Sequence, residues 1–205
     1  MASEYSEDDQ IMIRLQEGAV GAFEELVCAW QQRLLAYFLR NTRDAQLSED
    51  LVQETLLRVH KAAWDYLPTG SFKGWIFRIA RNLLIDHTRR ASNDVLLKRV
   101  SPGSNSSGDT FDPLVLLQDD RVSPMQSAQT KEVAAIVSQL LEQLPEEQRQ
   151  TFQLHHYESL TLPEVADAMQ TSLPTAKSRL RLAKEKLRYL LSCRGFAEEP
   201  IPELN

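Results

Sequence analysis

Cysteine and long apolar runs are scarce in this chain of 205 residues. The two cysteines, Cys28 and Cys193, lie far apart and form no CxxC pair, so neither a disulfide framework nor a zinc site is indicated. No apolar run approaches the roughly 18 to 20 residues needed to cross a bilayer, and the N-terminal segment MASEYSEDD is acidic, unlike a signal peptide. The composition therefore predicts a cytoplasmic protein with no membrane contact.

Motifs of common catalytic sites are also missing. The sequence has no GxxxxGK loop, no GxGxxG fingerprint and no HExxH pair. His155 and His156 are adjacent, so they point about 100° apart on a helix, which is wrong for shared metal ligation. A pair of acids placed for acid–base catalysis cannot be identified. We expect a protein that is not an enzyme and that uses no cofactor and no metal.

The apolar pattern has no strand signature, because no alternation of four or more residues stands out. Helical periodicity recurs from about residue 7 to 90 and again after residue 131, whereas the segment between concentrates Ser, Asp, Gly and Pro. The sequence thus predicts an all-α fold with two small helical domains, the second containing a helix-turn-helix. The predicted boundaries are 1–90 for the first domain, 91–130 for a flexible linker, 131–193 for the second domain, and 194–205 for a short tail without an assigned role.

Two closely spaced helix starts lie in the second domain. Thr161 followed by Glu164 forms a capping box, and Ser172 with Pro174 repeats the start signal. Only about ten residues separate the two starts, enough for a two-turn helix and a tight bend, as in a helix-turn-helix. The second of these helices is then expected to read DNA.

That second helix has two distinct faces at about 100° per residue. The inward arc contains Ala176, Leu180, Ala183, Leu187, Leu190 and Leu191. The outward arc contains Lys177, Ser178, Arg181, Glu185 and Arg188. From 177 to 188 there are six basic residues and one acid, whereas an ordinary solvated face usually interleaves Glu with Lys. We therefore favour contacts with DNA phosphates and guanine edges over a solvated surface.

The net charge of −6 is unevenly distributed. Segments 73–90 and 177–188 together carry 11 of the 23 Lys and Arg residues but two of the 29 acids, which leaves 12 basic residues against 27 acids elsewhere. An acidic body with two basic stripes suggests a protein that touches DNA in two places. Such a charge distribution also predicts weak DNA binding by the protein alone.

The first basic stripe lies on a predicted helix that follows an aromatic loop. One side of that helix contains Trp75, Ile76, Ile79, Ala80, Leu83 and Leu84. The other side contains Arg78, Arg81, Asn82, Ile85 and Arg89. For Trp64 and Trp75 a core position is favoured, while Tyr66 and Phe72, beside the Pro-Gly break, are open between core packing and stacking on unpaired bases.

Three stretches together resemble a known family. The run DLVQETLLRVHKA (50–62), followed by FKGWIFRIARNLLIDHTRR (72–90), resembles the second conserved region of bacterial RNA polymerase sigma factors of the extracytoplasmic-function (ECF) group. QEGAVGAFEELV (16–27) resembles the start of that region, and residues 142–188 resemble the family's fourth region. The resemblance implies a sigma factor of the sigma-70 family that directs promoter-specific initiation and opens the DNA strands.

The resemblance also implies roles for individual residues. Contacts with the β′ clamp helices of core RNA polymerase are implied for Asp50, Gln53 and Glu54. Binding and opening of the minus-10 element are implied for Tyr66, Phe72, Arg78, Arg81, Asn82 and Arg89. Minus-35 binding is implied for Lys177, Ser178, Arg179, Arg181 and Lys184. The implied partners are core polymerase, including its β subunit, and promoter DNA; many relatives are also held inactive by an anti-sigma factor.

Several positions depart from the family pattern, including Pro174, where the family commonly has Gly before the residue matching Thr175. Gln170 replaces the usual Gly of the turn, where a positive φ costs a non-Gly residue about 1 kcal/mol. Ala176 replaces a β-branched core residue, and Leu182 replaces an Arg on the outward arc, where it meets a thymine methyl or leaves that contact unmade. Two other functions are left open: a stand-alone helix-turn-helix regulator, and an interaction protein that binds polymerase without reading DNA.

Overall fold

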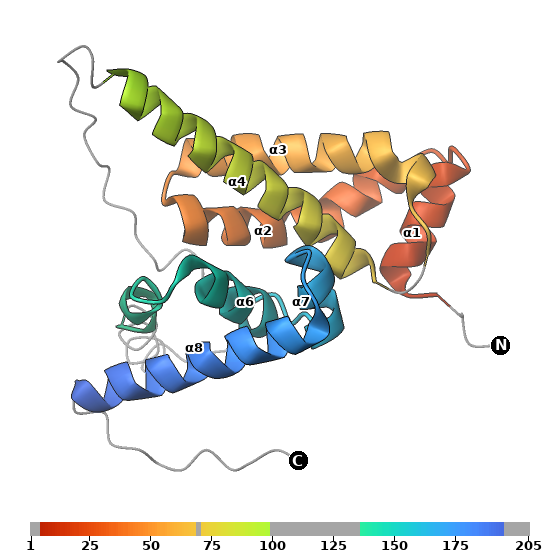
Figure 1. Ribbon diagram of the computed structural model, residues 1–205. Coiled ribbons are helices and arrows are strands. Elements are labelled where there is room, and N and C mark those ends of the chain that lie inside the picture. Colours follow the sequence, from red (N-terminus) through yellow and green to blue (C-terminus); the bar gives the residue numbers. More distant parts are fainter. Residues whose placement is uncertain (1–4, 69–70, 99–135, 195–205) are drawn as a thin grey trace, which may run out of the picture.

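The computed structural model describes residues 5–68, 71–98 and 136–194, the last eight of the second range by their backbone alone (Figure 1). Within these ranges every regular element is a helix, as the sequence predicts. The first five elements are α1 (Glu7–Gln16), α2 (Ala22–Thr42), α3 (Ala45–Ala62), the 3-10 turn η1 (Ala63–Asp65) and α4 (Phe72–Lys98). A helix at 136–141 is followed by α6 (Glu146–His156), α7 (Leu162–Ala168) and α8 (Leu173–Cys193). No described helix is both long and apolar enough to span a bilayer.

The helix-turn-helix begins where its capping residues predict. The Thr161 backbone N–H donates to the Glu164 carboxylate at 2.7 Å, which closes the capping box of α7. At the start of α8, the Thr175 N–H donates to the Ser172 hydroxyl at 3.3 Å. Gln170, between the two helices, has a φ of 50°, so the expected left-handed residue lies at the expected position. The prediction of a strained turn is thus confirmed.

The inward face of α8 also agrees with the sequence. Four of its predicted residues are buried: Ala176, Leu180, Ala183 and Leu187. The other two, Leu190 and Leu191, are partly buried against a small cluster that includes Leu140 and Leu144 of the preceding segment.

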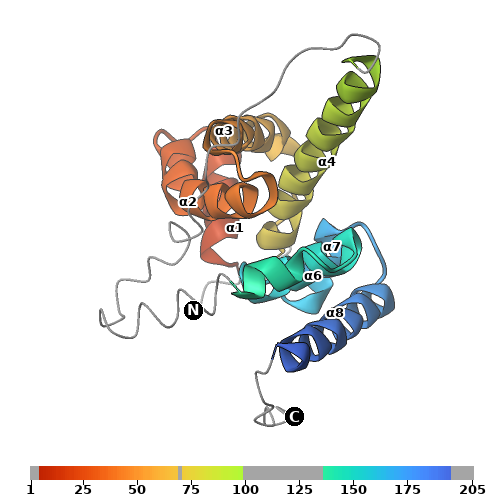
Figure 2. The ribbon, with the colours of Figure 1, turned by 90° about the vertical axis from the view of Figure 1, so that its left-hand side faces the viewer.

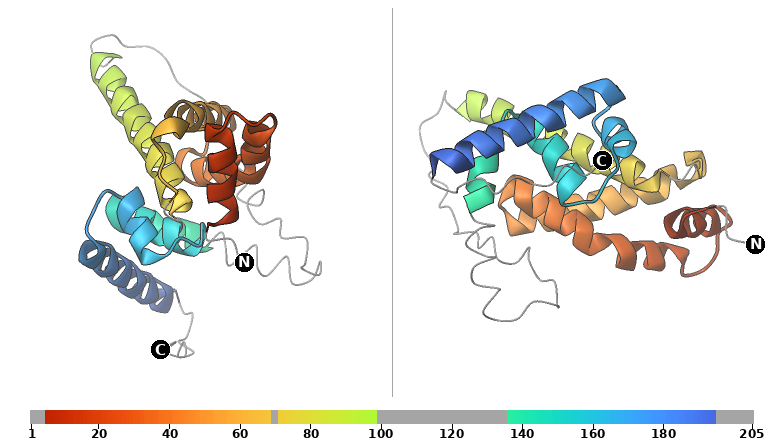
Figure 3. Two further views of the ribbon diagram at one scale, coloured as in Figure 1. Left: turned by 90° about the vertical axis from the view of Figure 1, so that its right-hand side faces the viewer. Right: turned by 90° about the horizontal axis from the view of Figure 1, so that it is seen from below.

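Helix α4 is longer than expected and crosses α2 and α3 diagonally (Figure 1). It continues to Lys98, eight residues past the predicted domain boundary at residue 90, and its C-terminal end projects beyond the neighbouring helices (Figure 3). The rest of the predicted linker, 99–130, and nearly all of the predicted tail lie outside the described residues.

The described chain forms two lobes, an N-terminal lobe (5–98) and a C-terminal lobe (136–194), which share one hydrophobic cluster. Leu154, Leu160 and Val165 of the C-terminal lobe belong to the same buried cluster as Ile76 and Phe77 of α4. Helix α7 packs against α4, and α6 and α7 lie between α4 and α8 (Figure 2). The C-terminal lobe thus covers one side of α4, while α2 and α3 cover another.

The aromatic loop before α4 is built around two buried rings. Tyr66 and Phe72 are 4% and 1% exposed, and their rings meet edge to face with centroids 5.6 Å apart. The Tyr66 hydroxyl donates to the fully buried carboxylate of Asp9. Burial, together with this hydrogen bond, raises the pKa of Tyr66 above its usual value. Both rings are therefore core in this structure, the first of the two readings left open by the sequence.

The core position predicted for Trp64 is wrong, because its side chain is 72% exposed. The physical reason is η1: this 3-10 turn changes the angular spacing of successive residues, so that Ala63 points inward and Trp64 outward. Trp75, by contrast, is partly buried and packs on the Tyr66 ring at a centroid distance of 4.9 Å. The helical periodicity of α3 therefore does not predict which residues of η1 are buried.

Replacing Gln170 with Gly should stabilise the C-terminal lobe. The φ of 50° at this residue costs a non-Gly side chain roughly 1 kcal/mol, part of which the extra flexibility of Gly in the unfolded chain offsets. We expect Gln170→Gly to raise the free energy of unfolding by about 0.5 kcal/mol in urea titrations. Gln170→Ala keeps the strain and is the control; an equal gain for that variant would contradict the explanation.

Tyr66→Phe should destabilise the N-terminal lobe, because the buried Asp9 carboxylate loses a hydrogen-bond donor. The expected loss in free energy of unfolding is about 1–3 kcal/mol, measured by thermal and urea unfolding. Tyr5→Phe, at a side chain that is 43% exposed, is the matched control and should be neutral. A neutral Tyr66→Phe variant would show that the hydrogen bond to Asp9 adds no net stability.

Candidate DNA and polymerase interfaces

The outward face of α8 presents most of the predicted minus-35 residues to solvent. Lys177, Ser178, Arg181 and Lys184 are exposed, and Arg181 pairs with Glu185 on the next turn at 2.6 Å. Leu182 is also exposed, at 39%, on the same side of the helix. The exposed ion pair between Arg181 and Glu185 contributes little in water, so Arg181 can exchange it for a phosphate contact. This basic face is accessible as it stands.

Arg179, the fifth predicted minus-35 residue, points elsewhere. Its side chain is 26% exposed, and its Nη2 lies 2.6 Å from Oε2 of Glu147 in α6. A contact between Arg179 and DNA would require this ion pair to break. The structure therefore separates Arg179 from the four exposed residues of the set.

The predicted minus-10 residues on α4 are largely covered by the C-terminal lobe. Arg78 Nη1 lies 3.0 Å from Asp167 Oδ1 in α7. Arg81 is nearly buried, donates from Nε to Gln150 Oε1 at 2.7 Å and has Nη2 3.4 Å from Glu147 Oε1. The sequence predicts an outer face for these arginines, but in the structure the C-terminal lobe packs over that face. The side chains that bind them belong to residues 89 and 69 positions further along the chain, which a local helical period does not identify.

The two other predicted minus-10 residues on α4 are less enclosed. Asn82 is partly buried, while Arg89 is 74% exposed on its side chain and lies 3.5 Å from Asp86. The C-terminal end of α4 extends past the C-terminal lobe (Figure 3). The basic stripe of α4 is thus covered at its N-terminal half and open toward its C-terminal end.

The predicted polymerase-binding residues share an exposed face of α3. Asp50 and Gln53 are exposed, and Glu54 pairs with Arg58 at 2.8 Å, a hydrogen bond that lowers the pKa of the Glu54 carboxyl. Leu57, one turn further on, is 49% exposed and continues the same face. Leu57 is not among the predicted polymerase contacts, although its spacing of four from Gln53 places it on the same helix face.

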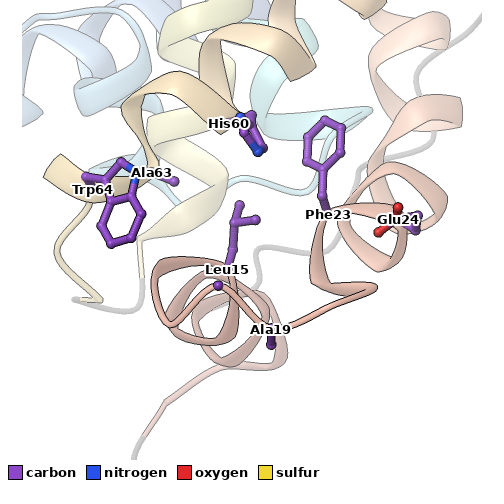
Figure 4. A pocket seen from close by; sticks show the side chains of 8 residues that line it. Leu15, Ala19, Phe23, Glu24, His60, Ala63 and Trp64 are labelled. Atoms are coloured by element: carbon purple, nitrogen blue, oxygen red, sulfur yellow. The ribbon is translucent and has the colours of Figure 1, made fainter.

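A small cavity lies beside η1, between the C-terminal ends of α1 and α3 and the N-terminal end of α2 (Figure 4). Its volume is about 250 Å³, and its walls are mainly apolar: Leu15, Gly18, Ala19, Phe23, Glu24, His60, Ala63 and Trp64. The rings of Phe23 and His60, which both line it, meet edge to face with centroids 4.8 Å apart. Among the described residues, no cluster of three or more His, Cys, Asp or Glu could hold a metal ion.

Two family descriptions match the chain in the same order as the two lobes. Sigma-70 region 2 matches residues 26–93, which include the exposed face of α3 and the basic part of α4. Sigma-70 region 4 matches residues 134–187, which include the helix-turn-helix.

Individual relatives extend the similarity over nearly the whole chain. The RNA polymerase sigma-H factor of Pseudomonas aeruginosa is 30% identical over 184 residues, covering 88% of this chain and 92% of the relative. The ECF RNA polymerase sigma factor SigM of Bacillus subtilis is 28% identical over 178 residues, covering 86% and 98%. The sigma factor RpoE of Bartonella quintana, solved with the anti-sigma factor NepR, superimposes with a TM-score of 0.62 at 20% identity, covering 84% of this chain and 98% of that one. With both conserved regions present and in order, the chain belongs to the ECF group of the sigma-70 family of RNA polymerase sigma factors.

Proposed function

We propose that this sigma factor assigns a separate task to each of three helices: α3 binds core RNA polymerase, α4 opens the minus-10 element, and α8 holds the minus-35 element. The observation that carries the proposal is the exposed basic face of α8, where Lys177, Ser178, Arg181 and Lys184 stand together on the second helix of a helix-turn-helix. A second exposed face, made of acidic and amide side chains, lies on α3, more than 100 residues earlier in the sequence. Because it acts on RNA polymerase, the protein works in the cytoplasm.

At the minus-35 element, α8 enters the major groove of duplex DNA. Lysine and arginine side chains hold the phosphates, and an arginine can also bind a guanine edge with two hydrogen bonds. Arg181 lies near the middle of the exposed face and is the strongest candidate for a base contact. Leu182, at its side, offers an apolar surface to a thymine methyl.

At the minus-10 element, Arg78, Arg81, Asn82 and Arg89 follow the backbone of the opened strand. Extruding a base costs a few kcal/mol of stacking, which the protein recovers through contacts that only single-stranded DNA can make. Tyr66 and Phe72, being buried, hold the loop from beneath and act as positioning residues. Trp64 in η1 and Leu67 in the loop that follows it, 72% and 73% exposed, offer the apolar surface for contact with unpaired bases.

On α3, the polymerase contact is centred on Asp50, Gln53 and Glu54 and includes Leu57. An exposed Leu among polar residues gives the apolar centre that a protein interface usually needs, with the polar groups around it fixing orientation. The family assigns the β′ clamp helices to this face. An anti-sigma partner stays a prediction, and the NepR complex of the solved neighbour gives it a precedent.

A run-off transcription assay with core polymerase and a promoter library distinguishes this function from that of a stand-alone regulator. A sigma factor yields transcripts that depend on both core and the added chain. A stand-alone regulator yields none, and binds duplex DNA tightly by itself.

Arg181→Ala should weaken promoter use while leaving core binding unchanged. Loss of a base contact costs about 1–3 kcal/mol, or roughly 5- to 150-fold in holoenzyme affinity for a selected promoter. Lys186→Ala is the matched control, because Lys186 has the same charge on the same helix but lies about 140° around its axis. Equal losses in single-round transcription for the two variants would indicate a general charge effect and contradict base reading by Arg181.

Leu57→Ser should weaken binding of core polymerase. A half-exposed Leu at the centre of an interface is expected to contribute at least about 1 kcal/mol, so the Kd for labelled core should rise about fivefold or more. Val20→Ser, at a fully exposed apolar side chain on the turn between α1 and α2, is the control. An unchanged Kd for Leu57→Ser would exclude this residue from the interface.

A further inference from the structure

The last residue of α1, Gln16, makes two hydrogen bonds to the turn η1. Its Nε2 donates to the carbonyl oxygens of Ala63 and Tyr66, each at 2.8 Å. Ala63 is the first residue of η1, and Tyr66 is its C-cap. A primary amide has two N–H donors, so this one side chain binds both carbonyls and spans the whole turn. Because its partners lie 47 and 50 residues away in the sequence, Gln16 fixes η1 from outside.

The same helix also holds the side chain of Tyr66. The Asp9 carboxylate, two turns before Gln16 on the same face of α1, accepts a hydrogen bond from the Tyr66 hydroxyl at Oδ1. Its Oδ2 accepts from the Ser6 hydroxyl at 2.7 Å and from the Ser6 backbone N–H at 3.3 Å. These bonds form the capping box of α1, which orients the carboxylate. Helix α1 therefore binds both the backbone and the side chain of Tyr66.

Apolar packing beside η1 is incomplete. Ala63 and Trp64 line the cavity of about 250 Å³, opposite Leu15 of α1 (Figure 4). A void supplies no atoms for van der Waals contact, and the ring of Trp64 is mostly exposed, so packing does little to orient this residue. The backbone on either side of Trp64, at Ala63 and at Tyr66, is the part that Gln16 binds. The orientation of Trp64 thus depends on those hydrogen bonds.

Orientation matters for the contact that the proposed function assigns to Trp64 and Leu67. Stacking on an unpaired base requires the plane of the ring to face the base, and a ring that is already oriented loses less conformational entropy on binding. Trp64 lies between the two carbonyls that Gln16 binds, and Leu67 follows the second of them directly. Both exposed side chains are therefore attached to backbone that α1 holds in place.

We propose that Gln16 is a positioning residue for strand opening: its amide, together with the Asp9 carboxylate, holds η1 in the conformation that presents Trp64 and Leu67 to unpaired bases. Helix α1, which contains none of the predicted DNA contacts, then takes part in promoter opening through η1. The inference rests on the proposed function in so far as Trp64 contacts DNA, whereas the hold of Gln16 on η1 can be measured without DNA.

Three variants test the hydrogen bonds of Gln16. Gln16→Met keeps the length of the side chain and its helix propensity but removes both donors. Gln16→Glu keeps the shape and places a carboxylate oxygen against the two carbonyls. Gln10→Met is the matched control, because Gln10 is an exposed residue of the same helix and its amide donates to the Tyr5 carbonyl oxygen at 3.2 Å.

Amide hydrogen exchange of the full chain, measured by NMR without DNA, reports the conformation of η1. The Tyr66 N–H donates to the Ala63 carbonyl oxygen at 3.1 Å, so it exchanges when the turn opens. We expect exchange on the order of tenfold faster in both Gln16 variants and an unchanged rate in Gln10→Met. Amides in the middle of α2 should keep their rates. An unchanged Tyr66 rate, or an equal acceleration in α2, would overturn the proposal.

Holoenzyme binding to a labelled forked promoter, with the non-template strand unpaired at the minus-10 element, tests the role in opening. The apparent affinity falls with the population of the competent conformation, so Gln16→Met should bind the fork about tenfold more weakly than Gln10→Met. Affinities for core polymerase and for a duplex fragment with the minus-35 element alone should be unchanged. Equal losses on all three ligands would indicate a merely structural role and contradict positioning.

A double-mutant cycle with Trp64→Ala shows whether Gln16 acts through the ring. In the Trp64→Ala background, Gln16→Met should weaken fork binding less than about twofold, because the oriented group is already absent. Additive losses would overturn the proposal. If the exchange rates change as expected but the wild-type holoenzyme binds forked and duplex promoters equally well, the proposed function fails and the hold of Gln16 on η1 stands.

Discussion

Burial of α4 on two sides is the constraint on which the rest of the structure depends. Its apolar side, with Ile76 and Ala80 fully buried, packs on the N-terminal lobe. Its basic side would be ordinary solvated surface if the C-terminal lobe did not cover it. A nearly buried guanidinium such as that of Arg81 is tolerated only with partners, which Gln150 and Glu147 supply. The position of α6 and α7 thus depends on the hydrogen-bond partners that the α4 arginines require, as well as on apolar packing against α4.

The uneven charge distribution of the chain also bears on the contact between the C-terminal lobe and α4. A net charge of −6, with nearly half of the cations on two short segments, leaves many acids free to meet those cations within the chain. The side chains of Asp167 and Glu147 keep 40% and 47% of their surface exposed, so their pairs with Arg78 and Arg81 are only partly desolvated and each adds modest attraction. These pairs place two acids of the C-terminal lobe on two cations of the α4 basic stripe.

The sequence patterns correctly predicted the features that depend on local geometry, namely helix starts and the buried face of a helix. Capping residues located the starts of α7 and α8, and the apolar period located the buried face of α8. Trp64 was misplaced because a 3-10 turn shifts the period, and the burial of Tyr66 depends on Asp9, 57 residues away. The contact between the lobes depends on pairs such as Arg78 with Asp167, 89 residues apart, and on the absence of a side chain at Gly74. Partners so distant in the sequence cannot be identified from local helical periodicity.

Two of the departures from the family pattern can now be separated by their physical consequences. Ala176 is fully buried and belongs to the cluster that joins the two lobes, so its small size concerns the packing of α8 against the rest of the protein. Leu182 is 39% exposed on the outward arc, so its replacement of an arginine concerns base preference. Under the proposed function, the loss of one phosphate or guanine contact at that position would weaken binding of the minus-35 element. Arg181 and Lys184 would then carry more of the binding by α8, and the minus-10 contacts of α4 would weigh more heavily in promoter choice.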